Sequence, residues 1–374
     1  MTVKDIIKNN PYRVMGVFSN DSMAALASNN CKMKAFAAIG KTTSYPHDMT
    51  LVIGSAPERD LNILSTSMAA VSSPMDRLKH GMFWFMNITD TDAKALKALA
   101  ESGNPLESRR IWEEGDENIS SLQNQLICCL LKDSRSYSKA IQTAWTLYSR
   151  HGHEFIRSVS CGLDVIDPCN LMLTFLTQIL RNAVGEIENW DKAIMRLGNS
   201  NIELCWAEAK ADDSIQKLQD ALNLAKTTEI HSAQDNYDIA IRLMRYAGPH
   251  LKIMKALLDK YPSLLSRYAT IADTVCEEIL NREIAYYNQF TWGKEEVMQI
   301  KIMEKFCYRY AATVRIKERC KKNINITLGR SKCSPLFPNG EPDKLFLESE
   351  RRKRNACLSA IMEGLKESKK KART

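Results

Sequence analysis

The sequence predicts an all-α protein, and three observations lead to this fold class. The 374 residues include only 15 Gly and 11 Pro, too few for the frequent turns of an all-β fold. Apolar residues recur at helical spacing along most of the chain, as at Ile119, Leu122 and Leu126. Capping residues and helix breakers separate these runs at short intervals. With 44% apolar and 26% charged residues, the composition is that of an ordinary globular protein.

The N-terminal stretch from Asn10 to Phe85 is expected to form four helices. Asn10 is a good N-cap, and Pro11 suits the first turn because it has no N–H group to leave unpaired. Gly16 is expected to end this short helix. The polar segment 41–56 is predicted to be a loop. The four helices are expected at 11–15, at 21–39, from 57 to 71 and from 74 to 85.

The two ends of this stretch resemble the J domain of DnaJ-type co-chaperones. The opening Asn10-Pro-Tyr-Arg-Val-Met-Gly-Val17 is similar to the family's Tyr-x-x-Leu-Gly-Val, and Val71-Ser-Ser-Pro-Met-Asp-Arg-Leu78 is similar to its Leu-Ser-Asp-Pro-x-x-Arg. The resemblance covers about a fifth of the chain. It implies a helical unit that associates with an Hsp70-type chaperone or with a client protein.

The working motif of the J domain, His-Pro-Asp at the end of its second helix, does not lie in its usual place. Ala38-Ile39-Gly40 occupies that position, and a rearranged Pro46-His47-Asp48 follows in the expected loop. An alternative interpretation of this tripeptide is an exposed loop histidine beside a helix-capping aspartate. The residues that the resemblance assigns to partner binding are Lys32, Lys34, Pro46, His47 and Asp48.

The remainder of the chain is predicted to be a succession of helices with turn signals between them. Breaks are expected at Gly248-Pro249 and at Trp292-Gly293, and residues 329–342 are expected to be a loop because of their Pro and Gly content. A basic tail is expected from 367 to 374. The expected helices cover 93–101, 105–113, 119–130, 140–148, 171–183, 186–197, 201–226, 235–246, 252–260, 262–289, 294–325 and 346–366.

The expected helix pair over 119–148 is similar to a tetratricopeptide hairpin, with small residues at the crossing followed by Tyr148. Only one such copy is found, and a solenoid needs about three, so an ordinary antiparallel helix pair is the alternative. We predict a J-like domain at 1–88, a hairpin region at 89–165, a helical bundle or array at 166–328, and a loop with a basic helix or tail at 329–374.

Several function classes lack support in the sequence. We find no His-Glu-x-x-His motif, no nucleophile elbow and no Gly-rich dinucleotide turn, so we expect neither an enzyme nor a cofactor. The 11 cysteines show no paired spacing and His151 and His153 would face apart on a helix, so no metal site is expected. The apolar run 126–131 is too short to span a membrane, and 1–10 lacks the apolar core of a signal peptide. We therefore expect a cytoplasmic protein.

Positive charge is concentrated at the C-terminal end of the chain. Residues 301–332 contain ten Lys or Arg against two Glu, and the last 74 residues carry a net charge of +12, against +8 for the whole chain. A solvated helix face with a solubilising tail is the plainer interpretation. Contact with nucleic acid or with an acidic partner is the alternative, in which Tyr308 and Tyr310 could stack on bases. The candidate residues are Lys301, Lys305, Arg309, Lys317, Arg319, Arg351, Arg352, Lys353 and Arg354.

Together these patterns predict a non-catalytic protein that is J-domain-like and chaperone-associated, or an adaptor. It is expected to bind protein partners, possible partners being an Hsp70-type chaperone or a client, through a helical array. The alternative is a helical protein that associates with nucleic acid through residues 301–374.

Overall fold

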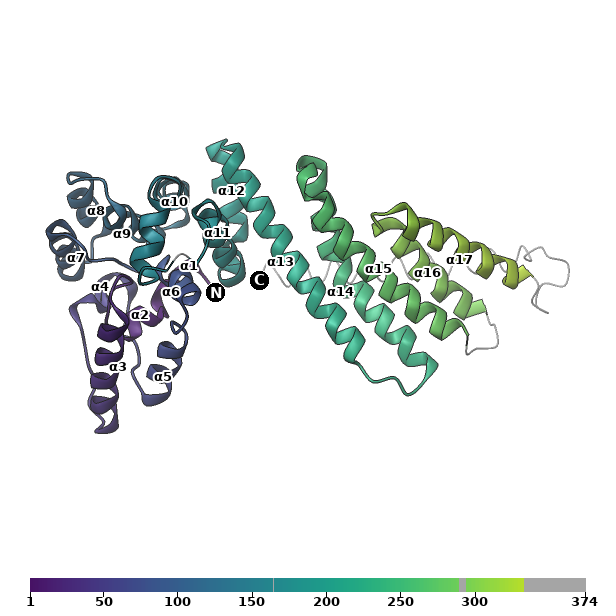
Figure 1. Ribbon diagram of the computed structural model, residues 1–374, viewed down its shortest axis with the longest axis horizontal. Helices are drawn as coiled ribbons and strands as arrows, with labels where there is room; N and C mark the ends of the chain where they lie inside the picture. The colour runs from purple at the N-terminus through teal and green to yellow at the C-terminus, as the bar shows by residue number, and fades with distance from the viewer. Residues whose placement is uncertain (164, 289–293, 333–374) are drawn as a thin grey trace. The chain divides into compact units, whose positions relative to one another are not determined.

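The computed structural model describes residues 1–163, 165–288 and 294–332, and within them the protein is helical without a single strand (Figure 1). The predicted all-α fold class is therefore confirmed. The chain forms two compact units, Met1–Asp213 and Ser214–Thr374. The boundary between them falls inside one long helix, α13 (Ser200–Thr227). The finer division of the chain into four parts stays a prediction.

The first unit follows the predicted series of helices, but the helix expected from 74 to 85 is too long, because α6 ends at Gly81, and the helix expected at 140–148 is too short, because α10 runs from Tyr137 to Val159. The expected loop 41–56 contains a 3₁₀ turn, η1 (Pro46–Asp48), and the short helix α4. Helix α5 begins at Leu61, four residues later than expected, because Asp60 is its N-cap and accepts a hydrogen bond from the N–H of Ile63. The helices are α1 (Val3–Lys8), α2 (Pro11–Val14), α3 (Met23–Ala38), α4 (Thr50–Ile53), α5 (Leu61–Ala69), α6 (Pro74–Gly81), α7 (Asp90–Ser102), α8 (Pro105–Glu113), α9 (Ile119–Leu130), α10 (Tyr137–Val159), α11 (Leu171–Asn182) and α12 (Ile187–Leu197).

A non-helical segment after α6 lies at the centre of this unit's core. All side chains of residues 82–86 are buried, and the ring of Phe83 stacks on Phe175 of α11 with centroids 5.3 Å apart. The side-chain amide of Gln123 on α9 lies 3.0 Å from the carbonyl oxygens of Met82 and Trp84. These bonds satisfy backbone groups that no helix or sheet satisfies. The N-terminal helices and α7–α12 therefore share one hydrophobic core.

The second unit is built from long helices that pack against their neighbours in the sequence. They are the end of α13, α14 (Ala233–Lys260), α15 (Leu265–Tyr287), α16 (Lys294–Tyr310) and α17 (Val314–Lys332). Helices α14 and α15, α15 and α16, and α16 and α17 lie side by side (Figure 1). Their facing surfaces are apolar, as the periodicity of the sequence indicates.

The expected break at Gly248-Pro249 is wrong, because α14 continues through it. Proline in a helix removes one hydrogen bond and costs about 3 kcal/mol. The apolar stripe of α14 is buried on both sides of this position, at Leu243 and Ala247 before it and at Leu251 after it. Pro249 itself is exposed, so the unpaired carbonyl upstream can be hydrated. Burial of the stripe outweighs the local cost.

The expected single helix over 294–325 is also wrong, because the chain breaks between α16 and α17. The carboxylate of Asp273 on α15 accepts hydrogen bonds from the N–H groups of Ala312, at 2.8 Å, and Thr313, at 3.3 Å. These two residues immediately precede α17, so a residue distant in sequence holds the chain where α16 ends and α17 begins. The hydroxyl of Tyr268 donates to the carbonyl of Tyr310 at 2.6 Å and ties down the end of α16.

The expected loop at 329–342 begins later than predicted, because α17 extends to Lys332. The rest of that loop, the turn at Trp292-Gly293, the helix expected at 346–366 and the basic tail lie outside the described residues. Over the ranges that the structure describes, none of the helices combines the length and the apolar character needed to cross a bilayer.

Candidate protein-partner site

The two motifs that resemble the J domain meet in the structure. Asn10 caps α2 by accepting a hydrogen bond from the N–H of Tyr12 at 3.0 Å, as expected. Its amide also donates to the carbonyls of His80, at 2.9 Å, and Phe83. The hydroxyl of Tyr12 donates to the carbonyl of Arg77 at 3.2 Å. The opening motif therefore packs directly on the closing motif, 60 to 70 residues later in the sequence.

Between these motifs, α3 and α5 pack side by side (Figure 1). Their contact surface contains Met33 of α3 and Leu64 of α5, which join Val14 of α2 in a small buried cluster. The segment between the two helices returns to α2 and places η1 against it. Pro46, His47 and Asp48 therefore lie beside the opening motif.

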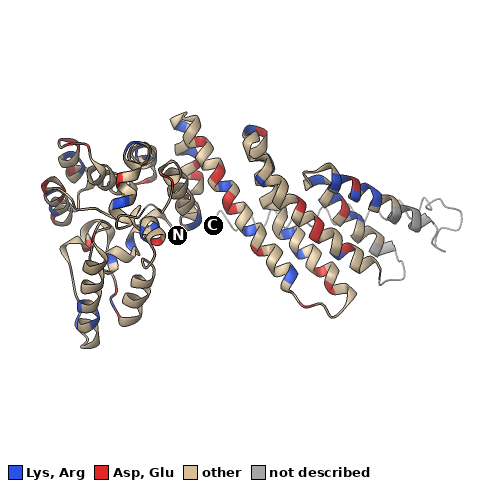
Figure 2. Ribbon diagram, viewed as in Figure 1, with Lys and Arg blue, Asp and Glu red and all other residues tan. Residues whose placement is uncertain are grey.

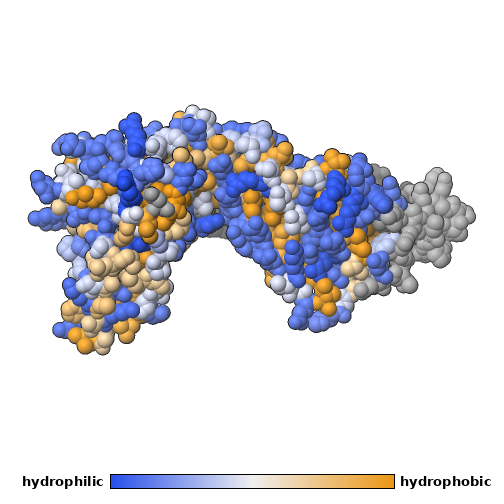
Figure 3. Space-filling model, viewed as in Figure 1, coloured by the Kyte–Doolittle hydropathy of each residue, from blue (hydrophilic) through white to orange (hydrophobic). Residues whose placement is uncertain are grey.

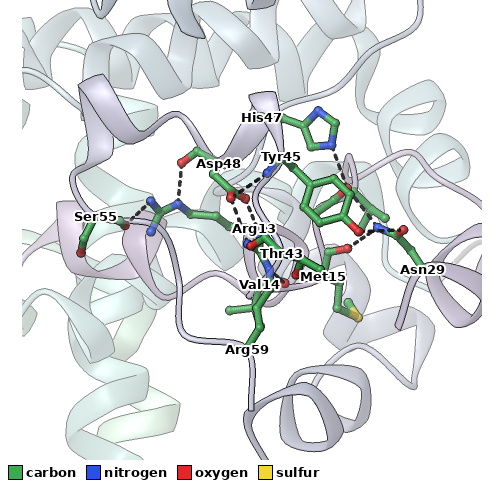
Figure 4. Close-up of polar contacts among 12 residues, drawn as sticks. Arg13, Val14, Met15, Asn29, Thr43, Tyr45, His47, Asp48, Ser55 and Arg59 are labelled. Carbon is green, nitrogen blue, oxygen red and sulfur yellow. Dashed lines mark hydrogen bonds and ion pairs between the residues drawn. The ribbon is translucent and has the colours of Figure 1, made fainter. Parts of the chain in front are cut away.

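Asp48 is enclosed within the chain, where it forms an ion pair with Arg59 (Figure 4). Both side chains are buried, and the Arg59 guanidinium also donates to the carbonyls of Val14 and Thr43, each at 2.8 Å. The Asp48 carboxylate further accepts the N–H of Tyr45 at 3.0 Å. A buried carboxylate needs such donors, because leaving it unpaired in the interior is costly.

A second arginine completes this cluster. The guanidinium of Arg13 is buried and lies 2.8 to 3.1 Å from the carbonyl oxygens of Lys8, Asp48, Gly54 and Ser55 (Figure 4). Burial lowers the pKa of Arg13, and the charge of Asp48 opposes that shift. We name Arg13, Asp48 and Arg59 the arginine–aspartate cluster. It fixes the long connection between α3 and α5 onto α2.

His47 is half-buried, and the expectation of an exposed loop histidine is wrong. Its Nε2 lies 2.8 Å from the carbonyl oxygen of Gly16, and its ring lies beside Phe18 with centroids 5.0 Å apart. Gly16 has φ +61°, a backbone conformation that residues with a side chain rarely adopt, so glycine is favoured there. The alternative role for Asp48 as a cap of the following helix is also wrong, since Met49 is the N-cap of α4.

The outer side of α3 is more apolar than that of a typical surface helix. Only Leu26, Asn30 and Met33 are buried among its 16 residues. Phe36 is 43% exposed, and Ile39, which follows α3, is 66% exposed. Figure 3 shows pale orange and orange over the lower left of the molecule, where Figure 1 places α3 and α5. The other exposed apolar residues of α3 are Ala24, Ala25, Ala27, Ala35 and Ala38.

The structure does not gather the predicted partner-binding residues into one polar site. Lys32 is exposed and Lys34 half-buried on α3, Pro46 is exposed and His47 half-buried in η1, and Asp48 is enclosed. Sequence reasoning did not identify Arg13 and Arg59, nor the exposed Phe36 and Ile39. The burial of an aspartate implies a cationic partner, but the sequence does not show that Asp48 is buried.

The predicted basic residues of the C-terminal region lie on two neighbouring helices (Figure 2). Lys305 and Arg309 are exposed on α16, whereas Lys301 is half-buried there. Lys317 and Arg319 are half-buried on α17, and Arg351, Arg352, Lys353 and Arg354 lie outside the described residues. Tyr308 is exposed, but Tyr310 is buried, so its expected role in stacking on bases is wrong.

Comparison with protein-family models, curated proteins and solved structures finds no match for this chain. Within the described ranges, no group of three or more His, Cys, Asp or Glu side chains is arranged to hold a metal ion. On the described N-terminal surface, the exposed apolar side chains Phe36 and Ile39 lie near Lys32 and Lys34 of α3.

Proposed function

We propose that the protein is a J-domain-like adaptor that binds a protein partner through the outer side of α3. The observation that carries this proposal is the exposure of Phe36 and Ile39 on a helix with only three buried side chains. A solvent-facing helix surface is normally polar, and an exposed apolar patch indicates an interaction site. The partner that the resemblance to the J domain implies is an Hsp70-type chaperone.

The chemistry of this surface suits a moderate, reversible contact. If a partner covers Phe36 and Ile39, their exposed parts supply roughly 2 kcal/mol of binding free energy. Lys32 lies on the same side of α3, one helical turn before Phe36, and can pair with a carboxylate of the partner. His47 is separate from this stripe and belongs to the turn held against α2.

The arginine–aspartate cluster gives Asp48 a role inside the chain. The Asp48 carboxylate already has Arg59 and the N–H of Tyr45 as partners, and it is buried. We therefore propose that binding depends on α3, and that Asp48 acts by holding the connection between α3 and α5 in place. Of the three residues in η1, Pro46 and His47 have accessible surface for a partner.

The test is binding of the full chain to a purified Hsp70-type chaperone, measured by calorimetry together with the chaperone's ATPase rate. We expect the pair Phe36→Ser and Ile39→Ser to weaken binding by roughly 30-fold, the equivalent of 2 kcal/mol. The matched control is the pair Leu106→Ser and Val184→Ser, which are 46% and 65% exposed in the same unit. This control is expected to bind like the unmodified protein.

The remaining outcomes separate the two parts of the proposal. Stimulation of the ATPase that is lost in His47→Gln means that the displaced tripeptide acts on the chaperone. Binding without stimulation leaves an adaptor that does not activate its partner. Absence of binding by the full chain, or equal losses in both serine pairs, rejects the chaperone as the partner of α3.

A further inference from the structure

Cationic side chains from three helices of the second unit lie next to one another. Lys255 on α14 donates from its Nζ to the carbonyl of Arg309 on α16, at 3.2 Å. The Nζ of Lys321 on α17 lies 6.0 Å from the ring centroid of Tyr308, the residue before Arg309 on α16. Lys305 precedes Tyr308 and Arg309 by three and four residues, so all three share one side of α16. We name Lys255, Lys305, Tyr308, Arg309 and Lys321 the basic strip.

Few acidic groups neutralise this strip. Residues 297–325 contain two glutamates, of which Glu304 is buried, and on α14 the exposed Asp259 lies one helical turn after Lys255. The other, Glu318, forms an ion pair with Lys321 at 2.9 Å. Lys305 and Arg309 have no acidic partner among the residues that the structure describes, and both are exposed. The strip therefore retains an uncompensated positive charge, which favours a polyanionic partner.

The exposure of Tyr308 indicates which class of polyanionic partner suits the basic strip. Its side chain is 43% exposed in the middle of the strip, although a tyrosine on a bundle helix is more commonly turned inward. The Lys321 ammonium lies over one face of the ring, at the outer limit of a cation–π contact. An aromatic face between cations is the arrangement that binds single-stranded nucleic acid, with bases stacked on the ring and phosphates on the cations.

We propose that the basic strip binds single-stranded nucleic acid. Lys255, Lys305 and Arg309 contact the phosphates, and one base stacks on Tyr308. A duplex hides the faces of its bases, and an acidic peptide has no base to stack, so neither makes use of Tyr308. This inference rests on the second unit alone and is independent of the proposed role of α3.

The test measures fluorescence anisotropy of labelled 20-nucleotide RNA and DNA strands with the full chain, at several salt concentrations. We expect Tyr308→Ala to weaken binding roughly tenfold, as the loss of one base stack does, and Tyr308→Phe to retain it. The pair Lys305→Gln and Arg309→Gln should reduce the slope of log affinity against log salt by about 1.4, because each phosphate that is no longer neutralised removes about 0.7.

A control variant with the same loss of charge tests whether net charge alone explains the binding. Lys97→Gln and Arg135→Gln remove two exposed cations from the first unit. If this pair weakens binding as much as the strip variants, the attraction comes from net charge and the proposal fails. It also fails if Tyr308→Ala changes nothing, if a 20-base-pair duplex or polyglutamate binds more tightly, or if neither strand binds at low salt. A preference for RNA or for DNA identifies which strand the strip takes.

Discussion

The two units of the protein surround a buried carboxylate with opposite kinds of neighbour, hydrogen-bond donors in the first and a second carboxylate in the second. In the first unit, Asp48 faces the guanidinium of Arg59 and the N–H of Tyr45, so its oxygens have donors. In the second unit, Glu283 of α15 is equally buried but lies near the carboxylate of Glu304. Burial raises the pKa of Glu283 to about 9, and the charge of Glu304 adds to that rise.

The difference shows that burial alone does not decide what an acidic residue contributes. Asp48 joins segments that are distant in sequence, and removal of Arg59 would leave the Asp48 charge buried without its ion-pair partner. Glu283 holds a proton at neutral pH, because ionisation beside a second carboxylate in a dry interior is unfavourable. The first arrangement fixes a loop, and the second makes the stability of its unit depend on pH.

The largest expected effect comes from removing the cation of the arginine–aspartate cluster. Arg59→Met leaves Asp48 buried without its ion-pair partner, and we expect the free energy of unfolding to fall by about 3–5 kcal/mol. Urea unfolding followed by tryptophan fluorescence measures this change, since Trp84 lies in the same core. The control Arg135→Met breaks an exposed pair and should leave the free energy of unfolding almost unchanged. Similar losses of stability in both variants would show that the buried ion pair of Asp48 is no more important to folding than an exposed pair.

A smaller effect of opposite sign is expected at Glu283. The unfolded chain releases this proton near pH 4.5, whereas the folded chain keeps it up to pH about 9. The contribution of Glu283 to stability is therefore greatest below pH 4.5 and falls as pH rises towards 9, by up to about 1.4 kcal/mol per pH unit.

Replacing the carboxyl group of Glu283 by an amide removes its contribution to the dependence of stability on pH. We expect Glu283→Gln to stabilise the second unit by roughly 1–3 kcal/mol at pH 8 and to flatten the profile of stability against pH. Unfolding at several pH values, followed by circular dichroism, tests this, with Glu229→Gln as an exposed control in the same unit. A destabilised Glu283→Gln with an unchanged pH profile would contradict it.

A third carboxylate, that of Asp273, shows that the second unit can also supply backbone N–H donors to a carboxylate. Asp273→Ala leaves the N–H groups of Ala312 and Thr313, just before α17, without their acceptor. We expect a loss of about 1 kcal/mol and faster hydrogen exchange at the start of α17. Asp220→Ala, on an exposed part of α13, is the control, and unchanged exchange in Asp273→Ala would show that the break between α16 and α17 has another cause.

The smallest effect on folding is expected at His47. A glutamine amide can also donate to the carbonyl of Gly16, so His47→Gln should change the free energy of unfolding by under about 1 kcal/mol. Thermal unfolding measures this directly. A larger loss would mean that the packing of the imidazole on Phe18 is essential to the turn, and that any binding defect of this variant has a structural origin.

Local signals predicted the fold well where one stretch of sequence supplies the whole cause. Asn10 caps α2, Gly16 follows it with positive φ, and α8 covers the predicted Pro105–Glu113. The errors arose where a distant residue decides. Helix α14 passes through Pro249 because its stripe is buried against other helices, and α16 ends where Tyr268 and Asp273 of α15 bind the chain.

The candidate site shows the same limit. The tripeptide 46–48 was visible in the sequence, but its state depends on Arg13 and Arg59, which approach it only after folding. The exposure of Phe36 was equally hidden, because helical spacing alone does not say which apolar residues find a neighbour.

The buried segment 82–86 has a consequence for synthesis on the ribosome. Phe83 cannot reach its final contact until Phe175 has been synthesised, and the carbonyl of Trp84 cannot accept its hydrogen bond until Gln123 has been synthesised. At about 5–20 residues per second, the ribosome needs roughly 5 to 20 seconds to extend the chain from Phe83 to Phe175. During this interval the apolar side chains of residues 82–86 lack their final contacts on the nascent chain. A fragment that stops before α11 prolongs the interval indefinitely, so we expect it to aggregate.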